Sequence, residues 1–392
     1  MEIRKLCAND YDQLLTMLNT TFSHKNGREV DFLNELPKMW VRDDAHLSHH
    51  LGLFEDGVLA ATVGIYPLPV RIGDQSFLFA TTGNVATLPQ YEGRGYFNTL
   101  FSMAMEELTA MGADAARLGG ARQRYGRFGF EAAGTAYKFT FNANNRIKYY
   151  RDAGQDITFV PIHREDTEVL AYCQQLSRKA AIYVERSEEE GYRDLYLALC
   201  SKHAAPYLAL RNGTPIGYLA AKADNQFVGQ SVNGRHILEL RTETDADHIA
   251  VVCAWQRHTG AEITLSLPPH MPIPLQTLCA GAESISVTSP SRFKIINFAG
   301  ITDALMKLKA RQGMIPGEAV ITVTGYGNLR LFADGTTAGC ELTSLPGNVT
   351  LDPLTATRLL FGSLGPETAC IGHPLLSAWL PLPLSWDTLD YV

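Results

Sequence analysis

The stretch VATLPQYEGRGYF (residues 85–97) decides how this chain is interpreted. It ends a strand-like run in which Gly83 and Asn84 suit a β-bulge, and it leads into a helical pattern over 95–111. A Gly-x-Gly turn joins the two. Glycines let backbone amides face a ligand, and the unpaired N–H groups of a first helical turn attract phosphate. Arg94 adds a positive charge there, although many such turns only cap helices.

The residues around this joint predict an α/β unit. An amphipathic helix is expected over 11–22, because its apolar residues recur at helical spacing. Two strand-like runs, 51–54 and 58–66, flank an Asp-Gly turn and predict a hairpin. A further strand is expected over 113–118, after the helix.

The middle of the chain repeats this order without the glycine-rich joint. The repeat comprises a hairpin, a strand, a helix and a strand, at 207–210 with 215–221, 237–243, 246–258 and 262–267. Its joint reads Thr-Glu-Thr-Asp-Ala over 242–246. This pattern indicates a degenerate internal duplication.

The last part of the chain predicts a third unit. A helix over 301–311 precedes strand-like runs with glycine turns, at 318–324, 328–332 and 339–342, and a short helix over 355–360. The alternation predicts an antiparallel sheet with flanking helices. We therefore expect three domains that pack together, with boundaries at 1–150, 151–285 and 286–392.

Composition excludes several classes of protein. The 392 residues have room for two or three domains, and with 46% hydrophobic and 19% charged residues they can bury a core. The net charge of −7 argues against nucleic acid as the main partner. Seven scattered cysteines without a CxxC pair fit a reducing cytoplasm. The uncharged stretch 263–282 contains four prolines, so no membrane helix is expected there, and the charged N-terminus does not resemble a signal peptide.

Two motifs together resemble one enzyme family. The first is QxxGxG over 90–95, and the second is GGARQRYGRFGF over 119–130. Both resemble the GNAT (GCN5-related) N-acetyltransferases, and the three-block layout is similar to the Eis-like branch. The resemblance implies an α/β (α+β) chain with two GNAT folds around mixed central sheets, the second degenerate. A C-terminal α+β domain like sterol carrier protein 2 (SCP2) would follow.

The resemblance also implies acetyl-CoA as cosubstrate and a set of residues that bind it. Backbone N–H groups on the bulged strand would pair with pantetheine, and the loop would hold the pyrophosphate. The implied cofactor-binding residues are Val85, Ala86, Thr87, Gln90, Glu92, Gly93, Arg94, Gly95 and Tyr96.

The resemblance aligns Tyr125 with the family's general acid. A phenol, whose ordinary pKa is about 10, can protonate a thiolate, since the ordinary pKa of a thiol is about 8.5. Alternatively, Tyr125 only packs in its turn. In the Eis-like branch the C-terminal carboxylate is thought to act as the base, which here implies Val392, although the branch's aromatic terminus is replaced. A disordered terminus is the alternative.

Weaker signals concern the amine pocket. Phe22 and Trp40 are candidates for apolar walls, with core packing as the alternative. His50 is a candidate for the pocket lining, and His46 lies four residues earlier, as in a helical metal pair. Without an HExxH motif we expect a solvated segment and no metal.

The sequence thus predicts an acetyl-CoA-dependent N-acetyltransferase that acts by direct attack of a primary amine. The acidic chain suits a small cationic molecule or a peptide amine, and the identity of the acceptor stays open. The alternatives are a lipid or sterol carrier and a non-catalytic acyl-CoA-binding protein. No nucleic-acid or membrane partner is expected, and the resemblance implies a homo-oligomer, a hexamer in the Eis-like branch.

Overall fold

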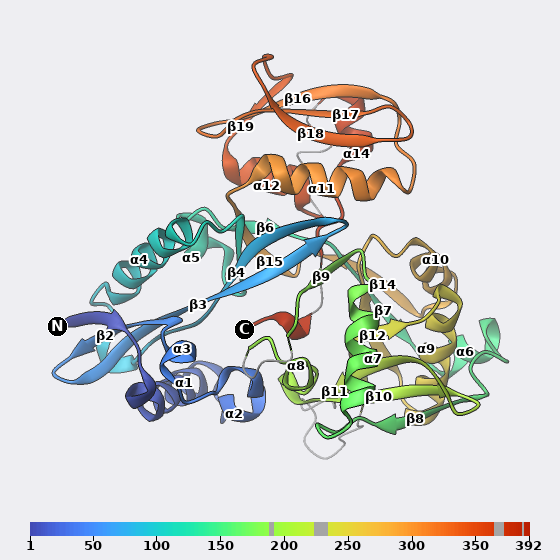
Figure 1. The fold of residues 1–392 in the computed structure, drawn as a ribbon, viewed down its shortest axis with the longest axis horizontal. Coiled ribbons are helices and arrows are strands. Elements are labelled where there is room, and N and C mark those ends of the chain that lie inside the picture. Colours follow the sequence, from blue (N-terminus) through green and yellow to red (C-terminus); the bar gives the residue numbers. More distant parts are fainter. Residues whose placement is uncertain (188–191, 223–233, 364–371, 386–387) are drawn as a thin grey trace.

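The computed structural model describes the chain except residues 188–191, 223–233, 364–371 and 386–387. The described strands form three sheets with helices packed on them, which confirms the predicted mixed α/β class. The first and second sheets lie side by side and the third lies beyond both (Figure 1). The C-terminus ends between the first two sheets, far from the third (Figure 1).

The first sheet holds the glycine-rich joint. Its strands run in the order β1-β2-β3-β4-β5-β15-β6, and β9 pairs with β3. Their bounds are β1 (Glu2–Lys5), β2 (His50–Glu55), β3 (Val58–Ile72), β4 (Gln75–Thr87), β5 (Ala115–Leu118), β6 (Glu131–Ala133), β9 (Ile182–Val184) and β15 (Ser291–Ile295). Strand β15 belongs to the segment 286–392 that we expected as a third domain, yet it pairs with β5 and β6.

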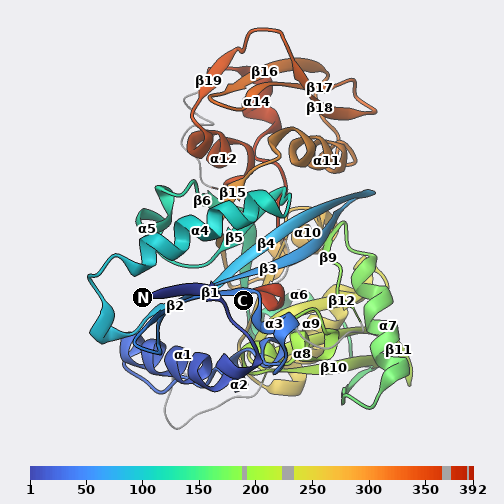
Figure 2. The same ribbon diagram turned by 60° about the vertical axis from the view of Figure 1, so that its left-hand side comes forward.

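Helices cover both faces of the first sheet. They are α1 (Tyr11–Asn26), α2 (Phe32–Glu35), α3 (Asp44–Leu47), α4 (Tyr96–Ala110) and α5 (Arg122–Gly126). Helix α4 lies on one face and α1 on the other (Figure 2). The predicted helix over 11–22 extends four residues further, because the chain leaves the helix only at Gly27, where φ is 62°.

The second sheet has the order β14-β7-β13-β12-β11-β10-β8. Its strands are β7 (Ala136–Phe141), β8 (Ile157–Pro161), β10 (Ala204–Arg211), β11 (Thr214–Lys222), β12 (His236–Thr242), β13 (Ile263–Leu267) and β14 (Ser284–Thr288). The helices of this part are α6 (Ala143–Tyr149), α7 (Thr167–Arg178), α8 (Leu195–Leu199), α9 (Asp245–Thr259) and α10 (Pro272–Gly281). Strand β7 lies within the segment 1–150 that we expected as the first domain.

The repeated order predicted from the sequence is confirmed. The first sheet contains β2-β3-β4-β5 and the second contains β13-β12-β11-β10, so the spatial order of corresponding strands matches. In each sheet the last pair is parallel and is connected by a helix, α4 or α9. The two sheets are therefore built on one plan.

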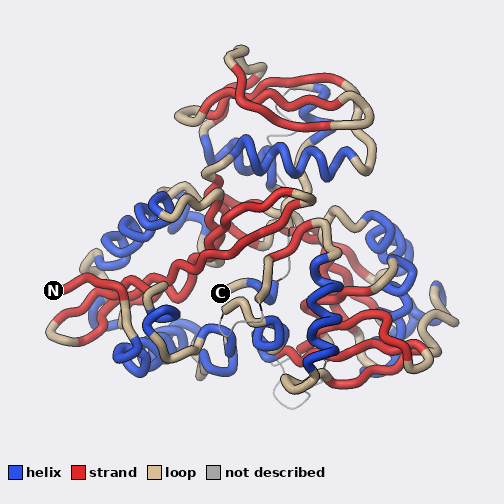
Figure 3. Tube along the Cα trace, in the orientation of Figure 1, coloured by secondary structure: helices blue, strands red, loops and turns tan. Residues whose placement is uncertain are grey.

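The third sheet has four strands in the order β18-β17-β16-β19. They are β16 (Gly317–Val323), β17 (Gly327–Ala333), β18 (Ala338–Thr343) and β19 (Val349–Leu351), with helices α11 (Phe298–Ala310), α12 (Pro353–Phe361) and α14 (Pro374–Trp379). The sheet is antiparallel as predicted, except that β19 runs parallel to β16. Figure 3 shows helices against one side of these strands.

The third sheet shares its apolar core with the first. Buried residues of α11, β16 and β17 form one cluster with residues of β3 and β4, such as Val70 and Phe79. In the described part of the chain no helix combines the length and the apolar character needed to cross a bilayer. The chain's parts are thus joined by packing, as the lack of a linker led us to expect.

Candidate functional site

The first sheet opens where β4 leaves β5. These strands pair from Phe79 to Thr82 on β4, and among the described strands the remainder of β4 pairs with β3 alone. The register of β3 and β4 shifts beside Gly83, and Asn84 has a φ of 50°, which confirms the predicted bulge. The backbone after the bulge therefore has one edge that a ligand can pair with.

The glycine-rich loop needs its glycines for backbone reasons. Gly93 and Gly95 have φ values of 80° and 84°, a region that side chains with a Cβ avoid. Gly95 is the N-cap of α4 and supplies no side-chain cap. The N–H groups of the first turn of α4 therefore stay available for an anion.

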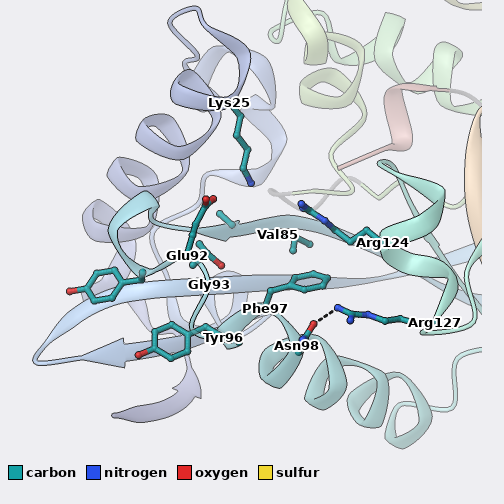
Figure 4. Close-up of a pocket in the computed structure, with 13 residues that line it drawn as sticks. Lys25, Val85, Glu92, Gly93, Tyr96, Phe97, Asn98, Arg124 and Arg127 are labelled. Carbon is teal, nitrogen blue, oxygen red and sulfur yellow. Dashed lines mark hydrogen bonds between the residues drawn. The ribbon is translucent and has the colours of Figure 1, made fainter.

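A cavity of about 420 Å³ lies at this helix end. Its walls come from the end of β4, the loop, the first turn of α4, α1 and α5, and they include the predicted residues Val85, Ala86, Thr87, Glu92, Gly93, Gly95 and Tyr96. Figure 4 shows the backbone of the loop and the side chain of Phe97 beside this space. The predicted residues Gln90 and Arg94 are not among the lining residues.

The positive charge of the cavity comes from residues other than Arg94. The Arg94 guanidinium donates to Glu55 at 2.8 Å, so it is held at the β2–β3 turn. Lys25, Arg124 and Arg127 line the cavity instead and extend toward it (Figure 4). None of these three was predicted. The motif RQRYGR over 122–127 was an available signal for Arg124 and Arg127, whereas no pattern in the sequence pointed to Lys25.

The cations of the cavity lie close enough to affect one another. Burial lowers the pKa of Lys25, and the nearby charge of Arg124 lowers it further, while Glu92 acts in the opposite direction. Arg127 donates to the side chain of Asn98 on α4 (Figure 4). Positive charges gathered at an uncapped helix N-terminus suit a ligand with several negative charges.

Tyr125 on α5 is 7% exposed and packs among aromatic rings. Its ring lies 5.2 Å from Phe101 and 5.9 Å from Phe97, measured between centroids. Burial raises the pKa of Tyr125, with Arg124 acting in the opposite direction, so the phenol keeps its proton at neutral pH. A Cβ on Gly120 would lie 2.9 Å from this ring, so the glycine allows the close approach.

The last residue, Val392, lies against the bulge of β4. A Cβ placed on Gly83 would be 3.1 Å from a backbone oxygen of Val392 and 2.8 Å from its Cγ1. Val392 packs on the same apolar cluster as Phe22 and Trp40. The structure thus brings these three predicted residues to one side of the strand that carries Val85.

His50 lies in the interior. Its Nε2 is 2.6 Å from the hydroxyl of Tyr66, and Asn84 donates to that hydroxyl at 2.7 Å. Burial lowers the pKa of His50 to about 3, so the ring is neutral at physiological pH. These three side chains tie β2 and β3 to the bulge of β4, a supporting network that the sequence analysis did not foresee.

The histidine-rich segment does not assemble a metal centre. Among the described residues no group of three or more His, Cys, Asp and Glu side chains is arranged to hold a metal ion. The Nδ1 atom of His46 is 2.7 Å from a carboxylate oxygen of Asp43. Asp43, the N-cap of α3, thus holds both the ring and the backbone N–H of His46, while His50 is buried elsewhere.

Comparison with known proteins agrees with this geometry. Residues 2–133 match the family described as acetyltransferase (GNAT) domain. No curated protein matches the chain. Among solved structures, a GCN5-related N-acetyltransferase from Anabaena variabilis superimposes with a TM-score of 0.69, at 16% identity, over 100% of both chains.

Two further structures are similar over nearly the whole chain. A probable N-acyltransferase from Enterococcus faecalis has a TM-score of 0.65 at 16% identity, covering 97% of this chain and 98% of its own. Eis1 from Mycobacterium abscessus has a TM-score of 0.65 at 15% identity, covering 99% and 98%. At such identities these structures establish the fold. The chain contains a GNAT acetyltransferase domain over residues 2–133. This domain supports the classification of the protein as an acyltransferase.

Proposed function

We propose that this protein is an acetyl-CoA-dependent N-acetyltransferase of the Eis-like type, which acetylates a primary amine by direct attack. The observation that carries the proposal is the opening of β4 from β5 beside an uncapped helix N-terminus. An unpaired strand edge suits the amide groups of pantetheine, and the helix end suits a pyrophosphate.

In this proposal different residues of the cavity bind different parts of acetyl-CoA. The N–H groups of Val85 and Thr87 pair with pantetheine, and an N–H there stabilises negative charge on the thioester oxygen during attack. The loop amides around Gly93 and Gly95 hold the pyrophosphate. Lys25, Arg124 and Arg127 supply the neutralising charge, a role that we expected of Arg94 from the sequence.

The proton transfers of the reaction are assigned to two residues. The amine nitrogen bonds to the acetyl carbon as the carbon–sulfur bond breaks, which leaves a proton surplus on nitrogen and a thiolate on coenzyme A. Tyr125 gives its phenolic proton to the thiolate. The carboxylate of Val392 accepts the proton of the amine, and solvent then restores both groups.

The acceptor is proposed to be a small cationic molecule or a peptide amine. The net charge of −7 favours encounter with cations, and the apolar cluster that holds Phe22, Trp40 and Val392 offers walls for the carbon skeleton. His50 is fully buried and bonded to Tyr66, so we no longer assign it to the wall of the amine pocket.

Release of free thiol from acetyl-CoA tests the proposed function. The panel of acceptors contains polyamines, aminoglycosides and peptide amines, with their N-acetylated forms as controls. We expect turnover with at least one free amine and none with its acetylated form. Tight binding of acetyl-CoA without turnover on any amine contradicts the proposal and favours a non-catalytic acyl-CoA-binding protein.

The third sheet gives the carrier alternative little support. The inner side of α11 is filled, with Ile301, Leu305 and Leu308 buried in a cluster that reaches the first sheet.

We keep the division into a catalytic GNAT domain (1–150), a GNAT-like domain (151–285) and an SCP2-like domain (286–392) as a proposal, although β7 and β15 cross its boundaries. A hexamer in the cytoplasm completes the proposal, and light scattering of the purified protein tests the oligomer.

A further inference from the structure

The last described residues, 388–392, are held by charged side chains from distant segments of the chain. The 3₁₀ turn Thr388–Asp390 lies between the first two sheets (Figure 1), and Leu389 and Asp390 are almost fully buried. Charged side chains are expensive to bury unless they are paired. The residues that pair with this segment therefore indicate why its charged side chain is buried.

Asp390 is the centre of the first set of contacts. The Nε atom of Arg186 donates to its carboxylate at 2.7 Å, and the two terminal nitrogens of Arg186 donate to Glu239 at 2.9 and 2.6 Å. The hydroxyl of Tyr218 donates to Glu239 at 2.6 Å. We call this set, Arg186, Glu239, Tyr218 and Asp390, the tail clasp; its first three members belong to the segment after β9, to β12 and to β11.

The clasp is fully paired at its guanidinium. Burial alone would lower the pKa of Arg186, but the carboxylates of Asp390 and Glu239 outweigh burial and raise it. Burial alone would likewise raise the pKa of Glu239, but Arg186 lowers it. Arg186 and Glu239 thus each favour the charged form of the other, and their hydrogen bonds fix the arrangement of the clasp.

Two neighbouring residues of the tail have partners of their own. The ammonium of Lys38 donates to the carbonyl oxygen of Leu389. The guanidinium carbon of Arg117, on β5, lies 2.9 Å from the centroid of the Tyr391 ring, and Lys202 lies 5.0 Å from it. Residues 389, 390 and 391 are thus each fixed separately, and Val392 follows them directly.

This network serves to define position more than to add stability. The cost of removing charges from water nearly cancels the attraction between them, so buried ion pairs contribute little net stability. They do penalise any other arrangement, because a displaced tail would leave Arg186 and Lys38 with unpaired donors in the interior. Burial already lowers the pKa of Lys38 to about 7.

We propose that Asp390 is a positioning residue, which acts through Arg186 and Glu239 to hold the carboxylate of Val392 at the bulge of β4. The inference rests on the proposed role of Val392 as the base. It makes the second sheet, which lacks the glycine-rich loop, a structural requirement of the reaction at the first.

Anchoring can be tested apart from catalysis with Asp390→Asn. The substitution keeps the shape of the side chain and leaves Arg186 paired with Glu239. Carboxypeptidase digestion, followed by mass spectrometry, should release Val392 roughly tenfold faster than from the wild type. The control is Asp247→Asn, which disturbs a different Arg–Asp pair of the second part, with Arg211. Equal release from Asp390→Asn and wild type overturns the anchoring.

A double-mutant cycle tests positioning. With an amine that the wild type acetylates, Asp390→Asn should lower kcat roughly ten- to a hundredfold and leave the KM for acetyl-CoA unchanged. In a chain that lacks Val392 the same substitution should have no further effect, and Asp390→Glu should recover part of kcat. Calorimetric binding of coenzyme A gives the folded fraction by which each kcat is corrected.

The outcomes separate the two proposals. Equal losses of kcat with and without Val392 mean that Asp390 acts through folding, and they overturn the inference. Full kcat without Val392 overturns both the base role and the positioning role while N-acetylation itself stands. Absence of turnover in the wild type contradicts the proposed function, and faster release of Val392 would then support the anchoring alone.

Discussion

The two strand-to-helix joints of this chain share a plan and differ in what caps the helix. In the first sheet β4 leads through Gly93 and Gly95 to α4, whose N-terminus has no side-chain cap and opens on the cavity. In the second sheet β12 leads to α9, where the Thr244 hydroxyl accepts from the Asp247 N–H at 3.2 Å. Asp245 and Asp247 also place two carboxylates in that first turn.

The difference shows what makes one helix end available to an anion and the other not. The positive end of a helix dipole attracts an anion only while its N–H groups are free. In α9 the Thr244 hydroxyl already binds one of these groups, and two carboxylates of the first turn offset the partial positive charge. Glycine supplies no competing oxygen, so the N-terminus of α4 remains available to a ligand.

The largest effect is expected at Tyr125, the proposed acid of the first part, for which the second part has no proposed counterpart. Tyr125→Phe removes the proposed acid without changing the packing of the ring, and it should lower kcat roughly a hundredfold or more. Acetyl-CoA binding, measured by calorimetry, should stay within a factor of two of the wild type. Tyr149→Phe, at an exposed tyrosine of α6, serves as the control. An unchanged kcat in Tyr125→Phe removes this residue from the mechanism.

The second-largest effect is expected when the N-terminus of α4 receives a carboxylate, as the first turn of α9 has. Gly95→Asp places a carboxylate at the N-cap of α4 and forces a residue with a Cβ to a φ of 84°. The KM for acetyl-CoA should rise roughly ten- to a hundredfold, because the new carboxylate competes for the N–H groups and repels phosphate.

Gly112→Asp is a matched control for that substitution. Gly112 lies at the other end of α4, also has a positive φ, of 69°, and has no atom within 4 Å of an added Cβ. Its backbone strain should be similar while the cavity is untouched. Equal increases of the KM for acetyl-CoA in Gly112→Asp and Gly95→Asp would show that backbone strain, and not competition for the N–H groups of α4, weakens cosubstrate binding.

A smaller effect should distinguish the arginines around the first joint. Arg124→Gln removes a charge that lines the cavity, and the KM for acetyl-CoA should rise about tenfold, as for a lost charge-assisted hydrogen bond. Arg94→Gln should change it less than about twofold, because Arg94 is held by Glu55 at the protein surface. A larger rise of the KM for acetyl-CoA in Arg94→Gln than in Arg124→Gln would show that Arg94, and not Arg124, binds the phosphate.

The smallest effect is expected at the second joint. Thr244→Ala removes the cap of α9 and should lower the free energy of unfolding by about 1 kcal/mol, measured by denaturant titration. The kcat and the KM for acetyl-CoA should stay unchanged, because α9 faces the second sheet. A rise in KM would mean that the second joint takes part in cosubstrate binding.

Local patterns in the sequence were enough to predict the elements of both joints. The helix expected over 95–111 is α4, and the strand expected over 237–243 is β12, each within two residues. The spacing of apolar residues and the placement of glycines depend only on residues close together in the chain, so both can be recognised in the sequence. The sequence also placed the bulge at Gly83 and Asn84, because glycine and asparagine tolerate unusual φ values.

Side-chain directions could not be predicted in the same way. Arg94 lies in the expected loop, yet it pairs with Glu55, 39 positions earlier. Arg124 and Lys25 meet across the cavity although about a hundred residues separate them in the chain. Such pairs depend on how strands and helices pack, and a spacing rule carries no information about them.

The class of fold, the repeated order of elements and the joint that can hold an anion could all be predicted from the amino-acid sequence. These follow from periodicity and from backbone preferences of single residues. The packed fold was needed to find that β15 pairs between β5 and β6, that Val392 reaches the bulge of β4 and that Arg186 holds Asp390. The reason is that each of these contacts joins residues distant along the chain, whose meeting is fixed by the packing of whole sheets.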